Sequence, residues 1–133
     1  MDHILQHSIM IVDDDKLTRE TLSRALSDTY TTFAVGSGVE ALELLQSEPI
    51  SVVLADLVMP GMGGMELLEA INTLEHRPMV ILITGQGTVD SAVEAMKKGA
   101  YDYLPKPISI DRLEVLIIKA VEAMKLRDEN IQL

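Results

Sequence analysis

The sequence contains no cysteine and few basic residues. Without cysteine, disulfide bonds, thiol catalysis and cysteine-based zinc sites are excluded, and this absence is typical of proteins in a reducing cytosol. The chain has 11 Lys and Arg against 21 Asp and Glu, which gives a formal net charge of −10. Because contacts with phosphates need basic side chains, we expect no direct nucleic-acid binding by this chain.

Long apolar runs are also absent. No stretch approaches the ~18 residues of a membrane span, and the amino terminus lacks the basic region and apolar run of a signal peptide. We therefore expect a cytoplasmic domain without membrane association. A chain of 133 residues is most simply one domain, large enough to bury its own core.

Five short apolar runs have the composition of buried strands. They cover residues 9–12, 31–35, 52–55, 79–83 and 101–104. Each is followed by a segment with apolar residues at helical spacing. Strands that alternate with helices predict a parallel sheet with helices on both faces.

Several helix starts can be predicted from capping residues. Asp15 is the expected cap of the first helix, Ser37 and Glu40 have the spacing of a capping box, and Thr88 or one of its neighbours is expected to cap the fourth helix. That fourth helix should end at Lys98-Gly99. Its expected buried face consists of Val89, Ala92, Val93 and Met96.

A fifth helix is predicted from about Ser109 to the end of the sequence, because no residue in between is a convincing stop. Its first apolar residues can cover the sheet; they are Leu113, Leu116 and Ile117. The 3,4 spacing then continues through Ala120, Met124 and Ile131, interrupted by Arg127. One face of a small sheet does not need this much apolar surface.

Two interpretations of this excess remain open. The helix can lie on the sheet and end in a polar tail, or it can also pack against a partner. We favour the second and predict a homodimer through the fifth helix. The pattern divides the chain into a globular domain, residues 1–120, and a helical extension, residues 121–133.

Reactive side chains follow four of the five strand runs. Asp13 and Asp14 follow the first run, Asp56 the third, Thr84 the fourth and Lys106 the fifth. In an open α/β sheet, ligands bind beyond the carboxyl ends of the strands. Two or three acids, a hydroxyl and an ammonium group at one edge match a divalent cation and a phosphoryl group on a carboxylate.

Asp13, Asp14 and Asp56 are the candidate metal ligands. Carboxylates this close repel one another unless a cation joins them, and ligands that are all oxygen suit Mg²⁺ or Mn²⁺. The alternative for residues 13–15 is that they only cap the first helix, where acids favour the positive end of the dipole. We assign that role to Asp15 and the metal to Asp13 and Asp14.

Asp56, Thr84 and Lys106 have the chemistry of a phosphoryl site. Asp56 can be one more metal ligand, or it can be the nucleophile that aspartyl-phosphate chemistry requires. Thr84 can be an ordinary turn residue or a hydroxyl donor to a phosphoryl oxygen. Lys106 stands between Pro105 and Pro107, which restrict the loop, so it is a candidate counter-charge for phosphate.

Together these motifs resemble the receiver domains of bacterial two-component response regulators. The residues that carry the resemblance are Asp13-Asp14 after an apolar strand, Asp56 with Met59-Pro60, Thr84-Gly85 and Lys106-Pro107. They occur within residues 9–107, in the order and at the spacing usual for the family.

The resemblance implies a fold, a function and a role for each site residue. The expected fold is the flavodoxin-like α/β sandwich, with five parallel strands in the order 2-1-3-4-5. The chain would be a phosphoacceptor and not an enzyme, with a sensor histidine kinase as its partner. The implied roles are phosphoacceptor for Asp56, Mg²⁺ binding for Asp13, Asp14, Asp56 and the backbone carbonyl of Val58, phosphoryl contact for Thr84 and Lys106, and aromatic switch for Tyr103.

A narrower resemblance is to the receivers of NtrC-like enhancer-binding activators. It rests on residues 83–90, 92–96, 99–103 and 126–130. It implies transcription regulation through ATPase and DNA-binding domains downstream, whose motifs do not follow in this sequence. One departure from the family is Gly63, where many relatives have Asp; it affects only the opening of the third helix, where Gly is a slightly poorer cap.

Two other functions compete with the signalling role. A Mg²⁺-dependent phosphohydrolase would also form an aspartyl-phosphate, but it generally needs a second acid near the nucleophile, and Asp56-Leu57-Val58 supplies none. A receiver-like adaptor without phosphorylation would not need the acids, the hydroxyl and the lysine together. We therefore favour the phosphoacceptor.

Overall fold

A computed structural model describes residues 7–132, with side-chain surroundings through residue 129. Its five strands form one parallel sheet in the order β2-β1-β3-β4-β5, which confirms the strand order that the resemblance implies. The strands are β1 (Ser8–Val12), β2 (Thr31–Val35), β3 (Val52–Asp56), β4 (Met79–Thr84) and β5 (Asp102–Pro105).

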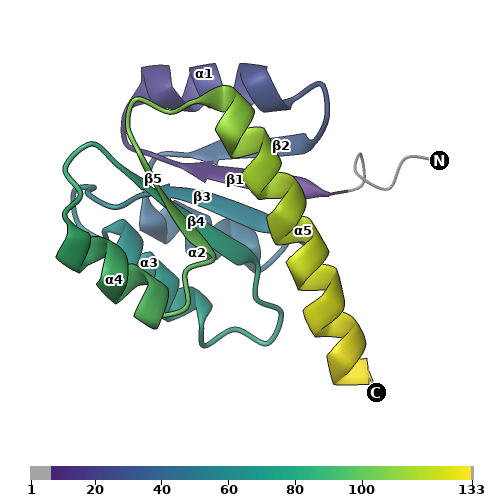
Figure 1. Ribbon diagram of the computed structural model, residues 1–133. Helices are drawn as coiled ribbons and strands as arrows, with labels where there is room; N and C mark the ends of the chain where they lie inside the picture. The colour runs from purple at the N-terminus through teal and green to yellow at the C-terminus, as the bar shows by residue number, and fades with distance from the viewer. Residues whose placement is uncertain (1–6, 133) are drawn as a thin grey trace.

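Five helices alternate with the strands, as predicted. They are α1 (Lys16–Leu26), α2 (Gly38–Leu45), α3 (Gly64–Ile71), α4 (Val89–Lys97) and α5 (Ile110–Gln132). Helices α1 and α5 cover one face of the sheet, and α2, α3 and α4 lie on the other (Figure 1). None of the described helices combines the length and apolar character of a membrane-crossing segment.

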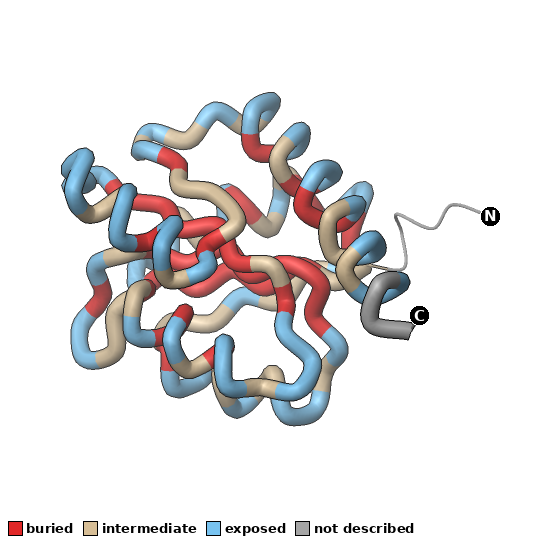
Figure 2. Tube along the Cα trace, turned by 60° about the horizontal axis from the view of Figure 1, so that its bottom comes forward, coloured by how far each residue is buried: buried red, intermediate tan, exposed pale blue. Residues whose placement is uncertain are grey.

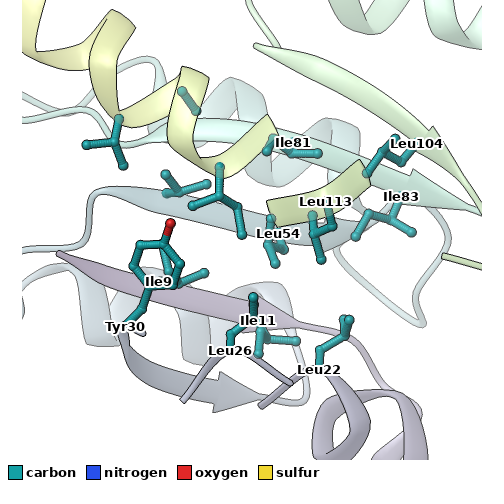
Figure 3. Close-up of a cluster of buried hydrophobic side chains, with 14 residues drawn as sticks. Ile9, Ile11, Leu22, Leu26, Tyr30, Leu54, Ile81, Ile83, Leu104 and Leu113 are labelled. Atoms are coloured by element: carbon teal, nitrogen blue, oxygen red, sulfur yellow. The ribbon is translucent and has the colours of Figure 1, made fainter. Parts of the chain in front are cut away.

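The sheet is buried on both faces because its central strands are apolar at almost every position (Figure 2). Ile9 and Ile11 point into the core shared with α1 and α5, where they meet Leu22 of α1 and Leu113 of α5 (Figure 3). The alternate residues of the strands point to the opposite core beneath α2, α3 and α4; they include Met10, Val12, Val53 and Ala55. The strands thus form a rigid frame whose ends carry the site.

The predicted caps of α1 and α4 are confirmed. The Asp15 carboxylate accepts hydrogen bonds from the hydroxyl and the backbone N–H of Thr18, and these bonds lower the pKa of Asp15 below its ordinary value. Thr88 caps α4, and Gly99 (φ 101°) follows the end of that helix in a conformation that favours glycine.

The capping box at α2 is only half formed. Ser37 accepts from the backbone N–H of Glu40 as predicted, but the Glu40 carboxylate accepts from Gly36 and not from Ser37. At α3, Gly63 is the N-cap without a side-chain bond, and Glu66 accepts from the Gly63 N–H. The departure at Gly63 therefore leaves the helix start in place.

The buried face predicted for α4 is wrong. Val89, Val93 and Met96 are 80%, 47% and 47% exposed, whereas Ala95 is fully buried. The small side chain of Ala95 faces the core beneath α2, α3 and α4, and the larger apolar side chains point away from it. Helical periodicity in the sequence shows that a helix has an apolar stripe, but it does not show whether that stripe faces the core or the solvent.

Helix α5 stays on the sheet for longer than predicted. Leu113 and Ile117 are buried as expected, but so are Val121 and Ala120, although Ala120 was counted among the apolar residues that the sheet does not need. Beyond them, Arg127 donates to the carbonyl oxygen of Arg77 at 2.8 Å, so the helix is also fastened to its own domain at the start of β4. Ile131 lies outside the residues whose side chains the structure describes.

The two edge strands of the sheet differ in sequence. β2 has only β1 as a neighbour and reads Thr-Thr-Phe-Ala-Val, without a charge or a proline. β5 has only β4 as a neighbour, is four residues long, and contains Asp102 and Pro105. In β5, Pro105 occupies the last register position, opposite Thr84.

Candidate functional site

The predicted site residues lie at the carboxyl edge of the sheet because the strands end in register. Val12 pairs with Ala55 and Asp56 with Ile83, so Asp13, which follows β1, lies beside Asp56 and Thr84, the last residues of β3 and β4. The Thr84 carbonyl accepts from the Lys106 N–H at 2.9 Å, which brings the β5–α5 loop to the same edge.

Asp13, Asp14 and Asp56 form a cluster of carboxylates. One oxygen atom of each lies within 4.8 Å of the others, at a separation that one cation can span. Asp13 and Asp56 are only 3% and 9% exposed, while Asp14 is exposed to solvent. An all-oxygen set with one open side fits a hard divalent cation such as Mg²⁺, which usually keeps several of its waters.

Lys106 lies between the two buried carboxylates. Its ammonium nitrogen is 3.2 Å from Asp13 Oδ2 and 3.2 Å from Asp56 Oδ2. Burial lowers the pKa of Lys106, but the hydrogen bonds and the charges of Asp13 and Asp56 outweigh burial and raise the pKa above its ordinary value. Lys106 is therefore a charged group that balances the acids in the absence of other cations.

Both carboxylate oxygens and the main-chain carbonyl of Asp13 accept hydrogen bonds. Its Oδ1 accepts from the N–H of Asp15 at 2.9 Å, and its Oδ2 accepts from Lys106. Its main-chain carbonyl accepts from Arg19 of α1 at 2.8 Å. The carboxylate has a fixed orientation at the end of β1.

The Asp56 carboxylate also has two hydrogen-bond partners. Its Oδ1 accepts from the N–H of Val58 at 3.2 Å and its Oδ2 accepts from Lys106. The Val58 side chain is exposed, so the loop after β3 turns its backbone, not a core side chain, toward the cluster. The Asp56 carboxylate is thus held at the edge of the sheet by Val58 and Lys106.

Thr84 and Tyr103 both lie beside the β4–α4 loop. The buried Thr84 hydroxyl accepts from the N–H of Gln86 at 3.0 Å, and the Tyr103 hydroxyl lies 3.0 Å from Ser91 Oγ on α4. Tyr103 therefore lies on the α4 side of the sheet, where it is half-buried.

The close packing around Tyr103 requires a glycine at position 87. A Cβ atom built on Gly87 would overlap the Tyr103 hydroxyl oxygen and would lie 2.7 Å from Thr84 Cγ2. Glycine is the residue that permits such close approach.

Sequence reasoning missed Arg19, Gly87 and Ser91. Arg19 is one arginine on a mostly polar helix, and Ser91 replaces the Glu or Gln of the usual capping box. Gly87 is visible in the sequence as a glycine in the loop after β4, but its contact with Tyr103 of β5 is revealed only by the fold.

The geometry is that of a known family. The family model of the response regulator receiver domain matches residues 9–118. A putative response regulator, NtrX-like, of Rickettsia conorii is 37% identical over 131 residues, which cover 96% of this chain and 28% of that protein. The DNA-binding transcriptional regulator NtrC of Escherichia coli is 40% identical over 130 residues, 94% of this chain and 27% of its own.

Solved structures agree with the sequence comparisons. A receiver domain protein from Clostridium thermocellum superposes with a TM-score of 0.85 at 32% identity, over 90% of this chain and 98% of that one. NtrX from Brucella abortus, solved in complex with ADP, has a TM-score of 0.85 at 31% identity, over 92% of this chain and 28% of its own. The chain spans little more than a quarter of the curated relatives it matches. It belongs to the response regulator receiver domain family and is similar to the receivers of NtrC and NtrX regulators.

Proposed function

We propose that this receiver domain accepts a phosphoryl group on Asp56 from a sensor histidine kinase. The observation that carries the proposal is the position of Lys106, whose ammonium group lies 3.2 Å from the carboxylates of both Asp13 and Asp56. A buried acid with a fixed cation beside it and a solvent-facing side is suited to receive a dianionic group.

In this proposal a carboxylate oxygen of Asp56 attacks the phosphorus atom of a phosphohistidine on the kinase. An O–P bond forms while the N–P bond breaks, and the imidazole leaves with the electron pair of that bond. The phosphoryl group of the product carries a charge of about −1.5 to −2, in place of the single negative charge of the Asp56 carboxylate. Lys106 stays close enough to donate to the phosphoryl oxygens, and Thr84 is the proposed hydroxyl donor.

The proposed Mg²⁺ ligands are the carboxylates of Asp13, Asp14 and Asp56 and the backbone carbonyl of Val58. Mn²⁺ prefers the same oxygen ligands. When bound, the cation would neutralise part of the negative charge on the transferring phosphoryl group. Asp14, which is exposed and has no cationic partner among the described contacts, is the acid most available to it.

The proposed output is a change on the face formed by α4, β5 and α5. A movement of Thr84 toward the phosphoryl group would alter its packing against Tyr103, because both side chains crowd the same point of the loop at Gly87. This local event would bias a two-state element.

In the proposed domain organisation, residues 1–120 act as the receiver and residues 121–133 extend toward ATPase and DNA-binding domains. The chain would control transcription in the cytoplasm. Self-association through α5 would be part of this control.

The phosphoacceptor is tested by mass spectrometry of the intact protein. Incubation with Mg²⁺ and acetyl phosphate should add one phosphoryl group to the wild type and none to Asp56→Asn. Asp90→Asn, an equal change at an exposed acid of α4, should behave like the wild type. Equal labelling of Asp56→Asn would refute the assignment.

The competing function is a phosphohydrolase that uses the same aspartyl-phosphate. The residue two positions after Asp56 is Val58, which cannot protonate a leaving group. We therefore expect only slow loss of the receiver's own phosphoryl group. Many turnovers of a phosphate ester per protein molecule, abolished by Asp56→Asn, would instead support the hydrolase.

A further inference from the structure

Arg19 of α1 makes one directed contact with the end of β1. Its Nη1 donates to the main-chain carbonyl oxygen of Asp13 at 2.8 Å. The same guanidinium nitrogen passes over Gly36, where an added Cβ would lie 3.4 Å from it. Arg19 thus bridges α1 and the ends of β1 and β2, and its side chain is half-buried there.

The carbonyl that Arg19 holds belongs to the peptide that joins two of the clustered acids. The register of β1 with β2 ends at Val12 and Val35, and the Asp13 N–H still bonds the Val35 carbonyl at 3.2 Å. The Asp13 carbonyl lies beyond this ladder, and Arg19 supplies its donor. Because a peptide unit is planar, fixing this carbonyl also fixes the N–H and the Cα direction of Asp14.

Among the described contacts, the Asp14 side chain has no hydrogen bond or ion pair of its own, and its backbone is also spanned by the bond from the Asp15 N–H to Asp13 Oδ1. The Asp13 carboxylate is held by Asp15 and Lys106, and the Asp56 carboxylate by Val58 and Lys106. The exposed Asp14 carboxylate has no comparable partner among the described hydrogen bonds and ion pairs. Its place in the cluster depends on the backbone that carries it.

We infer that Arg19 is a positioning residue for the divalent-cation site: it orients the Asp13–Asp14 peptide so that the Asp14 carboxylate meets those of Asp13 and Asp56. The inference rests on the metal site of the proposed function. Arg19 itself touches neither the cation nor the phosphoryl group. Partners that orient metal ligands commonly change metal affinity about 10–100-fold when they are removed.

A purely electrostatic role predicts the opposite sign. Arg19 is a cation near a cation site, so its removal would strengthen Mg²⁺ binding if charge alone mattered. If Arg19 only fastened α1 to the sheet, its removal would lower the melting temperature and leave the Mg²⁺ dissociation constant unchanged. Of the three roles, only the positioning role predicts that removal of Arg19 weakens Mg²⁺ binding.

The experiment is a calorimetric Mg²⁺ titration of the 133-residue chain and three variants, without any phosphoryl donor. Arg19→Gln should raise the dissociation constant about tenfold or more. Arg19→Lys keeps the charge but loses the planar donor, so it should also weaken binding. Arg24→Gln removes the same charge from an exposed position of the same helix and should leave the constant unchanged or slightly lower.

Each outcome decides the inference. The inference is overturned if the dissociation constant of Arg19→Gln is equal to or below that of the wild type. If Arg19→Gln does not fold, Mg²⁺ binding by Arg19→Lys with the wild-type constant overturns it instead. Melting curves in EDTA establish that each variant is folded. If the wild type binds no Mg²⁺, both the metal site of the proposed function and this inference are wrong. If the wild type binds Mg²⁺ and Arg19→Gln has the same dissociation constant, only the inference is wrong.

Discussion

The phenol oxygen of Tyr103 lies 3.0 Å from the hydroxyl oxygen of Ser91, and this pair ties β5 to the first turn of α4. Ser91 also closes the cap of that helix, because its hydroxyl donates to the Thr88 carbonyl at 3.0 Å and accepts from the Thr88 N–H at 2.9 Å. A displacement of Tyr103 therefore disturbs the start of α4 directly.

The first prediction concerns Gly87. Gly87→Ala should expel the Tyr103 ring, because the new methyl group would overlap its hydroxyl oxygen and crowd Thr84 Cγ2. Overpacking of this kind commonly costs about 1–3 kcal/mol of stability. In a protein labelled with fluorotyrosine, the fluorine resonance of residue 103 should move to a solvent-exposed position without any phosphoryl group.

The control for this prediction lies in the same loop. A Cβ on Gly85 would meet only Lys106 side-chain carbons, at 3.7 Å and 3.9 Å, which are ordinary contacts. Gly85→Ala should leave the resonance of residue 103 in place. An unchanged resonance of residue 103 in Gly87→Ala would contradict the prediction, because it would mean that the loop moves to accommodate the methyl group while Tyr103 stays in place.

The second prediction concerns Asp14. Asp14→Ala should weaken Mg²⁺ binding markedly, because it removes the most accessible carboxylate of the cluster. In EDTA the variant should be slightly more stable than the wild type, by up to about 1 kcal/mol, since one of three neighbouring negative charges is gone and the site is exposed there. Calorimetric titration and thermal unfolding measure the two effects, and an unchanged titration would rule out the metal site.

The third prediction concerns Lys106 and pH. Its raised pKa means that the folded protein holds this proton more tightly than the unfolded chain does. The ion pairs of Lys106 therefore stabilise the fold fully below the ordinary pKa of 10.5, and this contribution falls as the pH rises through the higher folded-state pKa.

Lys106→Met tests this linkage by denaturant unfolding between pH 8 and pH 11.5. The variant leaves two buried acids without their cation, and we expect a loss of about 1–3 kcal/mol at pH 8. The difference from the wild type should shrink at the alkaline end. Lys98→Met is the control: the pKa of Lys98 is also raised, by hydrogen bonds that it donates to Glu69 and Glu94, but its ion pairs are exposed and should contribute little.

The strand ends could be predicted from the sequence because each apolar run stops at a residue with obvious chemistry. Asp13, Asp14, Asp56 and Lys106 do come together at one edge, since parallel strands place their carboxyl ends on the same side. Their roles in phosphorylation stay predictions.

The orientation of α4 could not be predicted in this way. Val89 and Val93 repeat at helical spacing, but the stripe they form faces solvent, and the core side is lined by Ala95. Contacts such as Arg19 with the Asp13 carbonyl were equally out of reach, because they join a side chain to a backbone atom and leave no trace in apolar periodicity.

The fourth prediction concerns the end of α5. Truncation after Val121 should give a monomer by sedimentation at concentrations where the full chain self-associates, because it removes Met124 and the exposed Leu126. The truncation also removes the bond from Arg127 to the Arg77 carbonyl. Leu126→Asp therefore serves as a second variant that leaves this bond in place, and it should weaken association too.

The full chain must show association for this prediction to stand. If it sediments as a monomer at high micromolar concentration, with and without beryllofluoride as a phosphoryl mimic, α5 does not mediate a dimer. In that case the bond between Arg127 and the Arg77 carbonyl would leave the end of the helix as a fixed part of its own domain.

The unlike edges of the sheet have a consequence for colloidal behaviour. β5 is short and carries a charge and a proline, features that discourage another strand from joining it. β2 has neither, and its Thr-Thr-Phe-Ala-Val sequence is rich in residues that favour strands. In concentrated or partly unfolded preparations, aggregation by strand addition should therefore start at β2, at the edge of the sheet opposite to β5 and Tyr103.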